Sequence, residues 1–132
     1  KIVYYVGRMT FEKGVAVLLN AAPKILWEMG GAAKFVIIGG GNIERLQLQA
    51  LHLGIYNKCY FTGFMSDEDL DKFQTVADCA VFPSLYEPFG IVALESFAAK
   101  VPVVVSDTGG FPEVVRHGQT GIVTRANNPD SL

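Results

Sequence analysis

The sequence predicts an α/β domain, a doubly wound, Rossmann-like three-layer α/β/α fold built on a six-stranded parallel sheet. Short apolar segments alternate along the chain with longer segments whose apolar residues recur at helical spacing. Several short segments, such as FVII, AVF and VPVVV, are apolar at consecutive positions. This pattern is typical of strands that have helices on both faces of the sheet, and such strands are parallel.

Each element is expected from its local pattern. Strands are predicted at 1–6, 34–38, 58–62, 79–82, 101–106 and 121–124. Helices are predicted at 15–29, 43–53, 67–75, 90–99 and 111–117. Ser66, followed by three acidic residues, is a favourable N-cap for the third helix. Pro129, followed by Asp130 and Ser131, is read as the start of a further helix.

Composition excludes several classes of protein. Half of the 132 residues are apolar and only 18% are charged, so the chain should fold, and its length suits one domain. A net charge of −2 gives no general attraction for nucleic acid or an anionic membrane. With no apolar run long enough to span a bilayer and no signal peptide, we expect a cytoplasmic protein. Cys59 and Cys79 are expected to be buried free thiols.

The loop after the first predicted strand carries two cations at the entrance to a helix. Arg8 offers a planar fork suited to phosphate oxygens, and Lys13 offers a point charge. Amides of the following first helical turn would add their own attraction for an anion. The loop therefore indicates either a diphosphate clamp or ordinary solvated surface charge.

The glycines at 39–41 do not complete a dinucleotide fingerprint. The pattern G-x-G-x-x-G requires a glycine where Glu44 stands, and it belongs after the first strand rather than the second. We therefore expect no nicotinamide or flavin cofactor. The acids at 67–69 are assigned to helix capping, and no metal site is expected. The glycines favour a tight turn that lets backbone approach a neighbouring loop or a ligand.

The segment at 83–95 holds two glutamates around a helix start. Glu87 precedes a proline and is expected to be extended in the loop, whereas Glu95 lies in the helix among apolar neighbours and needs a hydrogen-bond partner. Ligand hydroxyls would serve; the alternatives are an ion pair with Lys100 for Glu95 and a solvated loop acid for Glu87. Freed amides at the helix start would form a second anion site. They belong to Phe89, Gly90 and Ile91.

Taken together, these segments are similar to one family. They are VGRMTFEKG at 6–14, VIIGGG at 36–41, FTGFMSDEDL at 61–70, FPSLYEPFGIVALE at 82–95, PVVVSDTGG at 102–110 and PEVVRHGQTGIV at 112–123. In this order they resemble the retaining glycosyltransferases of the GT-B fold, the group 1 family that includes glycogen and sucrose synthases. The resemblance covers nearly the whole chain and corresponds to the C-terminal, nucleotide-sugar-binding half of such an enzyme.

The resemblance implies catalytic roles for three residues. Arg8 and Lys13 would neutralise the donor diphosphate as the glycosidic bond breaks, without a metal or other cofactor. Glu87 would lie against the donor sugar. A double displacement needs a carboxylate nucleophile, but a front-face route is commonly favoured in the family, so positioning of the sugar comes first for Glu87 and a nucleophilic role second.

The resemblance also assigns residues to donor binding. Glu95 would accept hydrogen bonds from the ribose hydroxyls, and the backbone at Gly63 and Phe64 would hold the base. The amides that would contact the donor sugar and the distal phosphate are those of Phe89, Gly90 and Ile91.

Residues 1–132 are thus expected to be a donor-binding domain, truncated from a longer enzyme and lacking its N-terminal acceptor domain. The expected reaction is transfer of a hexose, from ADP- or UDP-glucose, to an acceptor hydroxyl with retention. An α-glucan that binds through the missing domain is the expected acceptor, and the fragment alone should be inactive. The alternatives are a nucleotide-sugar epimerase or hydrolase of the same fold and a non-catalytic nucleotide-sugar-binding module.

Overall fold

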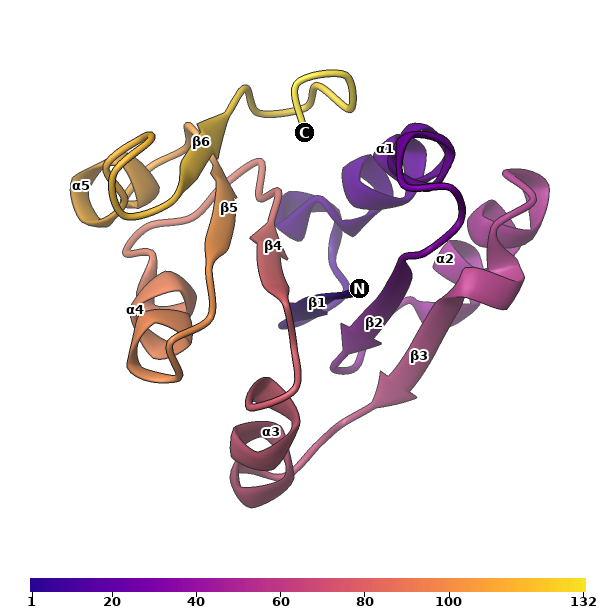
Figure 1. The fold of residues 1–132 in the computed structure, drawn as a ribbon, viewed down its shortest axis with the longest axis horizontal. Helices are drawn as coiled ribbons and strands as arrows, with labels where there is room; N and C mark the ends of the chain where they lie inside the picture. The colour runs from indigo at the N-terminus through magenta and orange to yellow at the C-terminus, as the bar shows by residue number, and fades with distance from the viewer.

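The computed structural model describes residues 1–132, and at its centre lies a sheet of six strands (Figure 1). The strands are β1 (Ile2–Val6), β2 (Lys34–Ile38), β3 (Cys59–Gly63), β4 (Cys79–Phe82), β5 (Val103–Ser106) and β6 (Ile122–Thr124). They pair in the order β3-β2-β1-β4-β5-β6, and every pair is parallel. The predicted six-stranded parallel sheet is therefore confirmed.

Helices cover both sides of the sheet. They are α1 (Val15–Glu28), α2 (Ile43–His52), α3 (Asp67–Gln74), α4 (Ile91–Ala98) and α5 (Phe111–Val114), with single 3-10 turns η1 (Phe11–Lys13) and η2 (Tyr56–Lys58). Figure 1 shows α1 and α2 on one side and α3 and α4 on the other. The expected cap of α3 is present, because the Ser66 hydroxyl oxygen accepts from the Asp69 amide at 3.2 Å.

Two predicted helical segments lie near the end of the chain. The fifth helix ends at Val114 rather than at 117, because Val115 adopts an extended conformation. Where a further helix is expected to start, residues 129–131 form a turn. The side-chain oxygen of Asn128 accepts from the amides of Asp130 and Ser131, both at 3.1 Å, as an N-cap residue does in a first helical turn. The helix expected from Pro129 stays a prediction.

Strand β1 ties the sheet to the helices and loops around it. Tyr4 and Tyr5 are both fully buried and, as neighbours in a strand, face opposite sides of the sheet. The Tyr4 hydroxyl accepts from Gln74 Nε2 of α3 at 2.8 Å and lies 3.1 Å from Ser96 Oγ of α4. The Tyr5 hydroxyl donates to the Arg8 carbonyl at 2.8 Å. One strand thereby positions two helices and the loop that follows it.

The loops at the carboxyl ends of the strands are held together by backbone bonds. Gly7 donates to the Ile38 carbonyl at 3.0 Å and Met9 to the Gly40 carbonyl at 2.7 Å, which joins the loops after β1 and β2. The amide of Leu85 donates to the Glu12 carbonyl at 2.7 Å, which joins the loop after β4 to the same segment. Since the strand order reverses between β1 and β4, these loops surround the crevice where open α/β sheets bind ligands.

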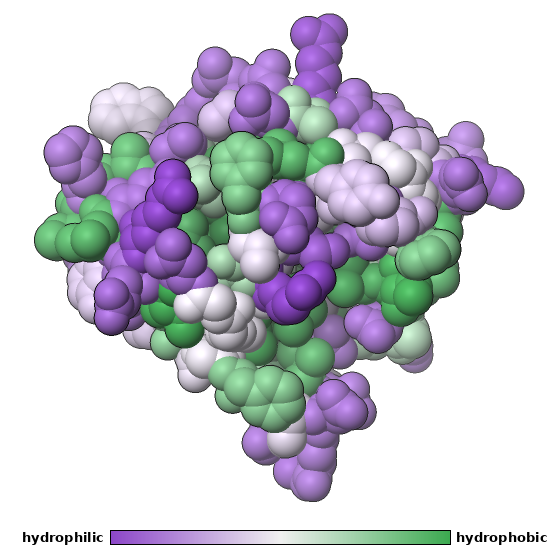
Figure 2. Space-filling view, turned by 180° about the vertical axis from the view of Figure 1, so that it is seen from behind, coloured by the Kyte–Doolittle hydropathy of each residue, from purple (hydrophilic) through white to green (hydrophobic).

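The surface is a mosaic of polar and apolar side chains. On the face in Figure 2, green regions are repeatedly interrupted by purple ones. No helix of the structure is both long enough and apolar enough to cross a membrane.

Gly14 makes the close packing of these loops possible, and its replacement should destabilise the fold. Its φ is +68°, and a methyl group at its Cα would overlap the Pro83 carbonyl oxygen. We expect Gly14→Ala to lower the free energy of unfolding by about 2–4 kcal/mol in urea denaturation. Gly30→Ala is the matched control, since Gly30 has φ +57° with nothing within 4 Å, and only about 1 kcal/mol of backbone strain is expected there. Equal losses of unfolding free energy in Gly14→Ala and Gly30→Ala would show that the contact of residue 14 with Pro83 is unimportant.

Candidate functional site

A cavity of about 570 Å³ opens beyond the carboxyl ends of β1 and β2 and extends between α3 and α4. Three of the predicted site residues line it: Arg8 from the loop after β1, Phe64 from the segment after β3, and Glu95 from α4. Arg8 and Glu95 are exposed, and Phe64 is 87% exposed. The structure thus brings together a cation, an aromatic ring and a carboxylate from three distant segments.

Glu95 is available for a ligand because α4 turns it away from the core. Its neighbour Ser96 is fully buried and donates to the Val92 carbonyl at 3.0 Å, which fixes the inner face of the helix. The alternative of an ion pair between Glu95 and Lys100 is not found, since the salt bridges of the structure involve other residues. The carboxylate can therefore accept hydrogen bonds from hydroxyl groups in the cavity.

Sequence reasoning missed Gln74, which also lines this cavity. Gln74 is only 5% exposed, and its amide group donates to the Tyr4 hydroxyl. Burial raises the pKa of Tyr4, so its hydroxyl stays neutral and serves as a fixed link between α3 and α4. No local signal marks Gln74, because it ends a short and mostly exposed helix where polar residues are ordinary.

Lys13 and Glu87 form a second cluster, and neither residue lines the cavity. Lys13 Nζ lies 2.8 Å from Glu87 Oε2, and the Gly90 amide donates to Glu87 Oε1 at 3.3 Å. Glu87 is only 7% exposed, so it is not the solvated loop acid that the sequence left open. The pair joins the loop after β1 to the start of α4, whereas Lys13 and Arg8 do not share one cavity.

The surroundings of Glu87 keep it ionised. Burial tends to raise the pKa of its carboxyl group, but the Lys13 ammonium and the amides of Gly90 and Phe89 outweigh burial and hold the pKa below its ordinary value of 4.5. At neutral pH the carboxylate is therefore charged, and both of its oxygens have partners.

The start of α4 differs from the expectation of three outward-pointing amides. Gly90 has a left-handed conformation, with φ +74°, and directs its amide onto Glu87. Phe89 and Ile91, on either side, are 72% and 55% exposed.

Gly63, the other backbone position expected to bind the donor, lies at the end of β3. Its carbonyl accepts from the Gly39 amide at 2.8 Å, so it holds the loop after β2.

The thiols offer no nucleophile near this site. Cys59 and Cys79 are both free, the first buried and the second half-buried. Burial raises the pKa of each thiol to about 11, so thiolate is scarce at neutral pH.

A Rossmann-like sheet with a cavity at its reversal of strand order is the arrangement in which doubly wound α/β domains bind nucleotides and other ligands. Comparison with known proteins then identifies the family. The family model described as glycosyl transferases group 1 matches residues 1–132, and the chain belongs to this family.

Curated relatives agree with this assignment. The chain is 45% identical over 133 residues to an uncharacterized glycosyltransferase of Methanocaldococcus jannaschii. This match covers 100% of the chain and 34% of the relative. It is 39% identical over 118 residues to the glycogen synthase of Mycobacterium tuberculosis, covering 89% of the chain and 28% of that enzyme. The chain thus spans about a third of the length of these relatives.

Solved structures share the fold. HepE of Anabaena in complex with UDP-glucose superposes with a TM-score of 0.88 at 27% identity, over 97% of this chain and 35% of that chain. The sucrose-phosphate synthase of Thermosynechococcus elongatus gives a TM-score of 0.89 at 28% identity, over 98% and 33%. These neighbours are glycosyltransferases of the GT-B fold, as the sequence predicted.

The Lys13–Glu87 pair should make stability depend on pH. Because the folded state lowers the pKa of Glu87, its stabilisation is present above the ordinary pKa of 4.5 and is lost as pH falls through the folded value. We expect Glu87→Gln to lower the free energy of unfolding by about 1–3 kcal/mol at pH 7, with the difference vanishing in acid. Urea denaturation of the unchanged protein and of Glu87→Gln, from pH 7 down to acid pH, measures the difference in the free energy of unfolding.

The control is Glu68→Gln, which breaks the exposed pair that Glu68 and Lys72 form within one helix at 2.6 Å. It should change stability by less than about 0.5 kcal/mol. A loss of stability in Glu87→Gln that is as small as in the control, or that does not depend on pH, would contradict a stabilising role for the Lys13–Glu87 pair.

Proposed function

We propose that this chain is the donor-binding, C-terminal half of a glycosyltransferase that transfers a hexose from a nucleoside-diphosphate sugar to an acceptor hydroxyl with retention. One observation carries the proposal: Arg8, Phe64 and Glu95 share one cavity, and the loop that carries Arg8 also carries Lys13, which pairs with Glu87. That arrangement supplies a partner for each part of such a donor.

The nucleoside would occupy the cavity between α3 and α4. Glu95 would accept hydrogen bonds from the ribose hydroxyls, because its carboxylate is exposed and has no cation partner. The base would lie against Phe64 and the backbone at Gly63. Arg8 would bind the diphosphate through its guanidinium fork, at the mouth of the same cavity.

The diphosphate gains charge as it leaves the sugar, and cations at fixed positions stabilise that charge. Lys13 Nζ uses one of its three donors on Glu87 and keeps two for phosphate oxygens. Arg8 would act from the other side. The segment that holds the exposed residues Phe89 and Ile91 would contact the sugar and the distal phosphate.

The surroundings of Glu87 favour a positioning role over a nucleophilic one. A carboxylate that accepts from Lys13 and Gly90 is held in place and is less free to attack carbon. Retention would then follow a front-face route, in which Glu87 orients the sugar and its negative charge stabilises the developing cation. A covalent glycosyl–enzyme intermediate is the second choice.

Donor, acceptor and location are further parts of the proposal. UDP-glucose is supported by the HepE complex, and ADP-glucose stays an option. An α-glucan acceptor is supported by the likeness to glycogen synthase, and it would bind through an N-terminal domain. The whole protein's reaction would take place in the cytoplasm.

Donor binding is tested by isothermal titration of the protein that contains this chain with UDP and ADP. We expect Arg8→Gln and Glu95→Gln each to raise the Kd for the preferred nucleotide roughly 10- to 100-fold, because each removes charge-assisted hydrogen bonds. Glu113→Gln is the control, since Glu113 is an exposed first-turn acid of α5 outside the cavity. Unchanged affinity in both site variants would overturn the placement of the nucleotide.

Transfer is tested with the same protein and radiolabelled UDP- or ADP-glucose, with and without a glucan. We expect Glu87→Gln to lower kcat at least about 100-fold, as loss of a preorganised charge does, and the isolated 132-residue chain to give no transfer. Sugar conversion or hydrolysis without acceptor would favour an epimerase or hydrolase. Donor binding with unchanged turnover in Glu87→Gln would argue against the catalytic role, and binding without any turnover in the parent protein would indicate a binding module.

A further inference from the structure

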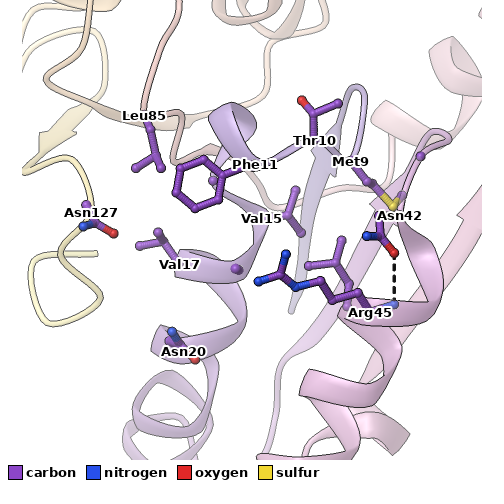
Figure 3. A pocket seen from close by; sticks show the side chains of 14 residues that line it. Met9, Thr10, Phe11, Val15, Val17, Asn20, Asn42, Arg45, Leu85 and Asn127 are labelled. Atoms are coloured by element: carbon purple, nitrogen blue, oxygen red, sulfur yellow. Dashed lines mark hydrogen bonds between the residues drawn. The ribbon is translucent and has the colours of Figure 1, made fainter.

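A second cavity, of about 410 Å³, lies on the other side of the loops that border the donor cavity (Figure 3). Consecutive residues of these loops are divided between the two cavities: Arg8 and Gly40 line the first, and Met9 and Gly41 line the second. Met9 and Gly41 form a parallel bridge, so the wall between the cavities is a pair of hydrogen-bonded backbone segments. The second cavity is therefore a separate site that shares a wall with the first.

The body of this cavity is apolar. Val15 and Val17 of α1 and Leu46 of α2 are buried side chains that contribute to its lining. Phe11, which is 78% exposed, and Leu85 border it on the side of the β4 loop (Figure 3). Such a cavity removes hydrocarbon from water and has the size typical of small-molecule sites.

Two polar side chains of the lining have their acceptor oxygens already bound. Asn20 Oδ1 accepts from Gln49 Nε2 at 2.8 Å, and Asn42 Oδ1 accepts from the Arg45 amide at 3.4 Å as the cap of α2. What each asparagine has left for a ligand is its NH₂ group, which is a donor. At these two positions the cavity therefore presents donors.

Arg45 adds the charge. Figure 3 shows its guanidinium directed across the cavity toward α1, and the salt bridges of the structure involve other residues. None of the 14 residues that line the cavity is acidic. The acidic neighbour on the same helix, Glu44, lines a different depression together with Leu48 and Leu51. A guanidinium with free donors is suited to a carboxylate or a phosphate.

We propose that this cavity binds a small organic anion. Its carboxylate or phosphate group is held by Arg45 with the NH₂ groups of Asn20 and Asn42, and its hydrocarbon part lies on Val17 and Phe11. The site is distinct from the donor cavity, and nothing in its chemistry requires that the donor be a nucleotide sugar.

The test uses the protein that contains this chain and three six-carbon probes: hexyl phosphate, hexanoate and hexanol. Binding is followed by NMR chemical-shift changes at Arg45 and Asn20. We expect saturable binding of at least one of the two anions, at least about tenfold tighter than hexanol, since one charged hydrogen-bonded pair accounts for such a ratio. The tighter of the two anions identifies the head group.

Arg45→Gln should weaken anion binding at least about tenfold. Arg45 is exposed and its side chain carries no hydrogen bond in the structure, so this variant should fold normally. The matched control is Arg116→Gln, which removes another exposed guanidinium outside the cavity and should leave binding unchanged.

Three results would overturn the proposal: no saturable anion binding up to about 20 mM, equal affinity for hexanol, or unchanged affinity in Arg45→Gln. A competition experiment separates the two cavities, because saturating UDP should leave the probe bound. Displacement by UDP would place the probe in the donor cavity and also overturn the proposal. Failure of UDP to bind, with the probe still bound at Arg45, would count against the proposed function alone.

Discussion

The parallel pairing of β1 with β4 is the constraint on which the rest of the structure depends. Here the strand order reverses, so the chain leaves β1 toward α1 on one side of the sheet and leaves β4 toward α4 on the other. The divergence opens a crevice at the carboxyl ends of both strands. Buried Tyr4 holds α3 and α4 on one face of β1, and Tyr5 holds the loop at Arg8. The positions of Arg8 and of Glu95 therefore follow from contacts made by a single strand.

The ion pair between Lys13 and Glu87 links the loops that follow β1 and β4, near the proposed position of the sugar. It joins the loop after β1 to the start of α4, in parallel with the bond from the Leu85 amide to the Glu12 carbonyl. If the two loops moved apart, the Glu87 carboxylate would be left buried without its cation, which is unfavourable. The ion pair therefore holds the two loops together. The same contact leaves Lys13 with two free donors and fixes Oε2 of Glu87, while the Gly90 amide binds Oε1. Stability and the proposed chemistry thus depend on the same atoms.

The loops after β1 and β2 serve two cavities because their bridged backbone passes from one cavity to the other. Residues 6–8 and 38–40 line the donor cavity, and residues 9–11 and 41–42 line the second. Gly39 and Gly41 permit that contact, since a side chain on Gly39 would overlap the Gly7 carbonyl and one on Gly41 would press on Met9. Gly39 and Gly41 are thus explained by the approach of a neighbouring loop, one of the two roles that the sequence suggested. A ligand in either cavity would touch the shared wall.

Local patterns determined the fold class and nearly every element. Apolar runs predicted the parallel strands, and Ser66 predicted its cap. The resemblance of the motifs around Arg8, Glu87 and Glu95 to a family of nucleotide-sugar enzymes pointed to the family that comparison then identified. Tertiary structure alone decided that Lys13 pairs with Glu87 and does not line the cavity that holds Arg8. It also decided that the buried Gln74 lines the same cavity as Glu95, and that Arg45 lines a second cavity. The reason is physical: periodicity reports which residues are apolar, but the side to which a loop or helix-end residue turns is set by strands and helices remote in sequence.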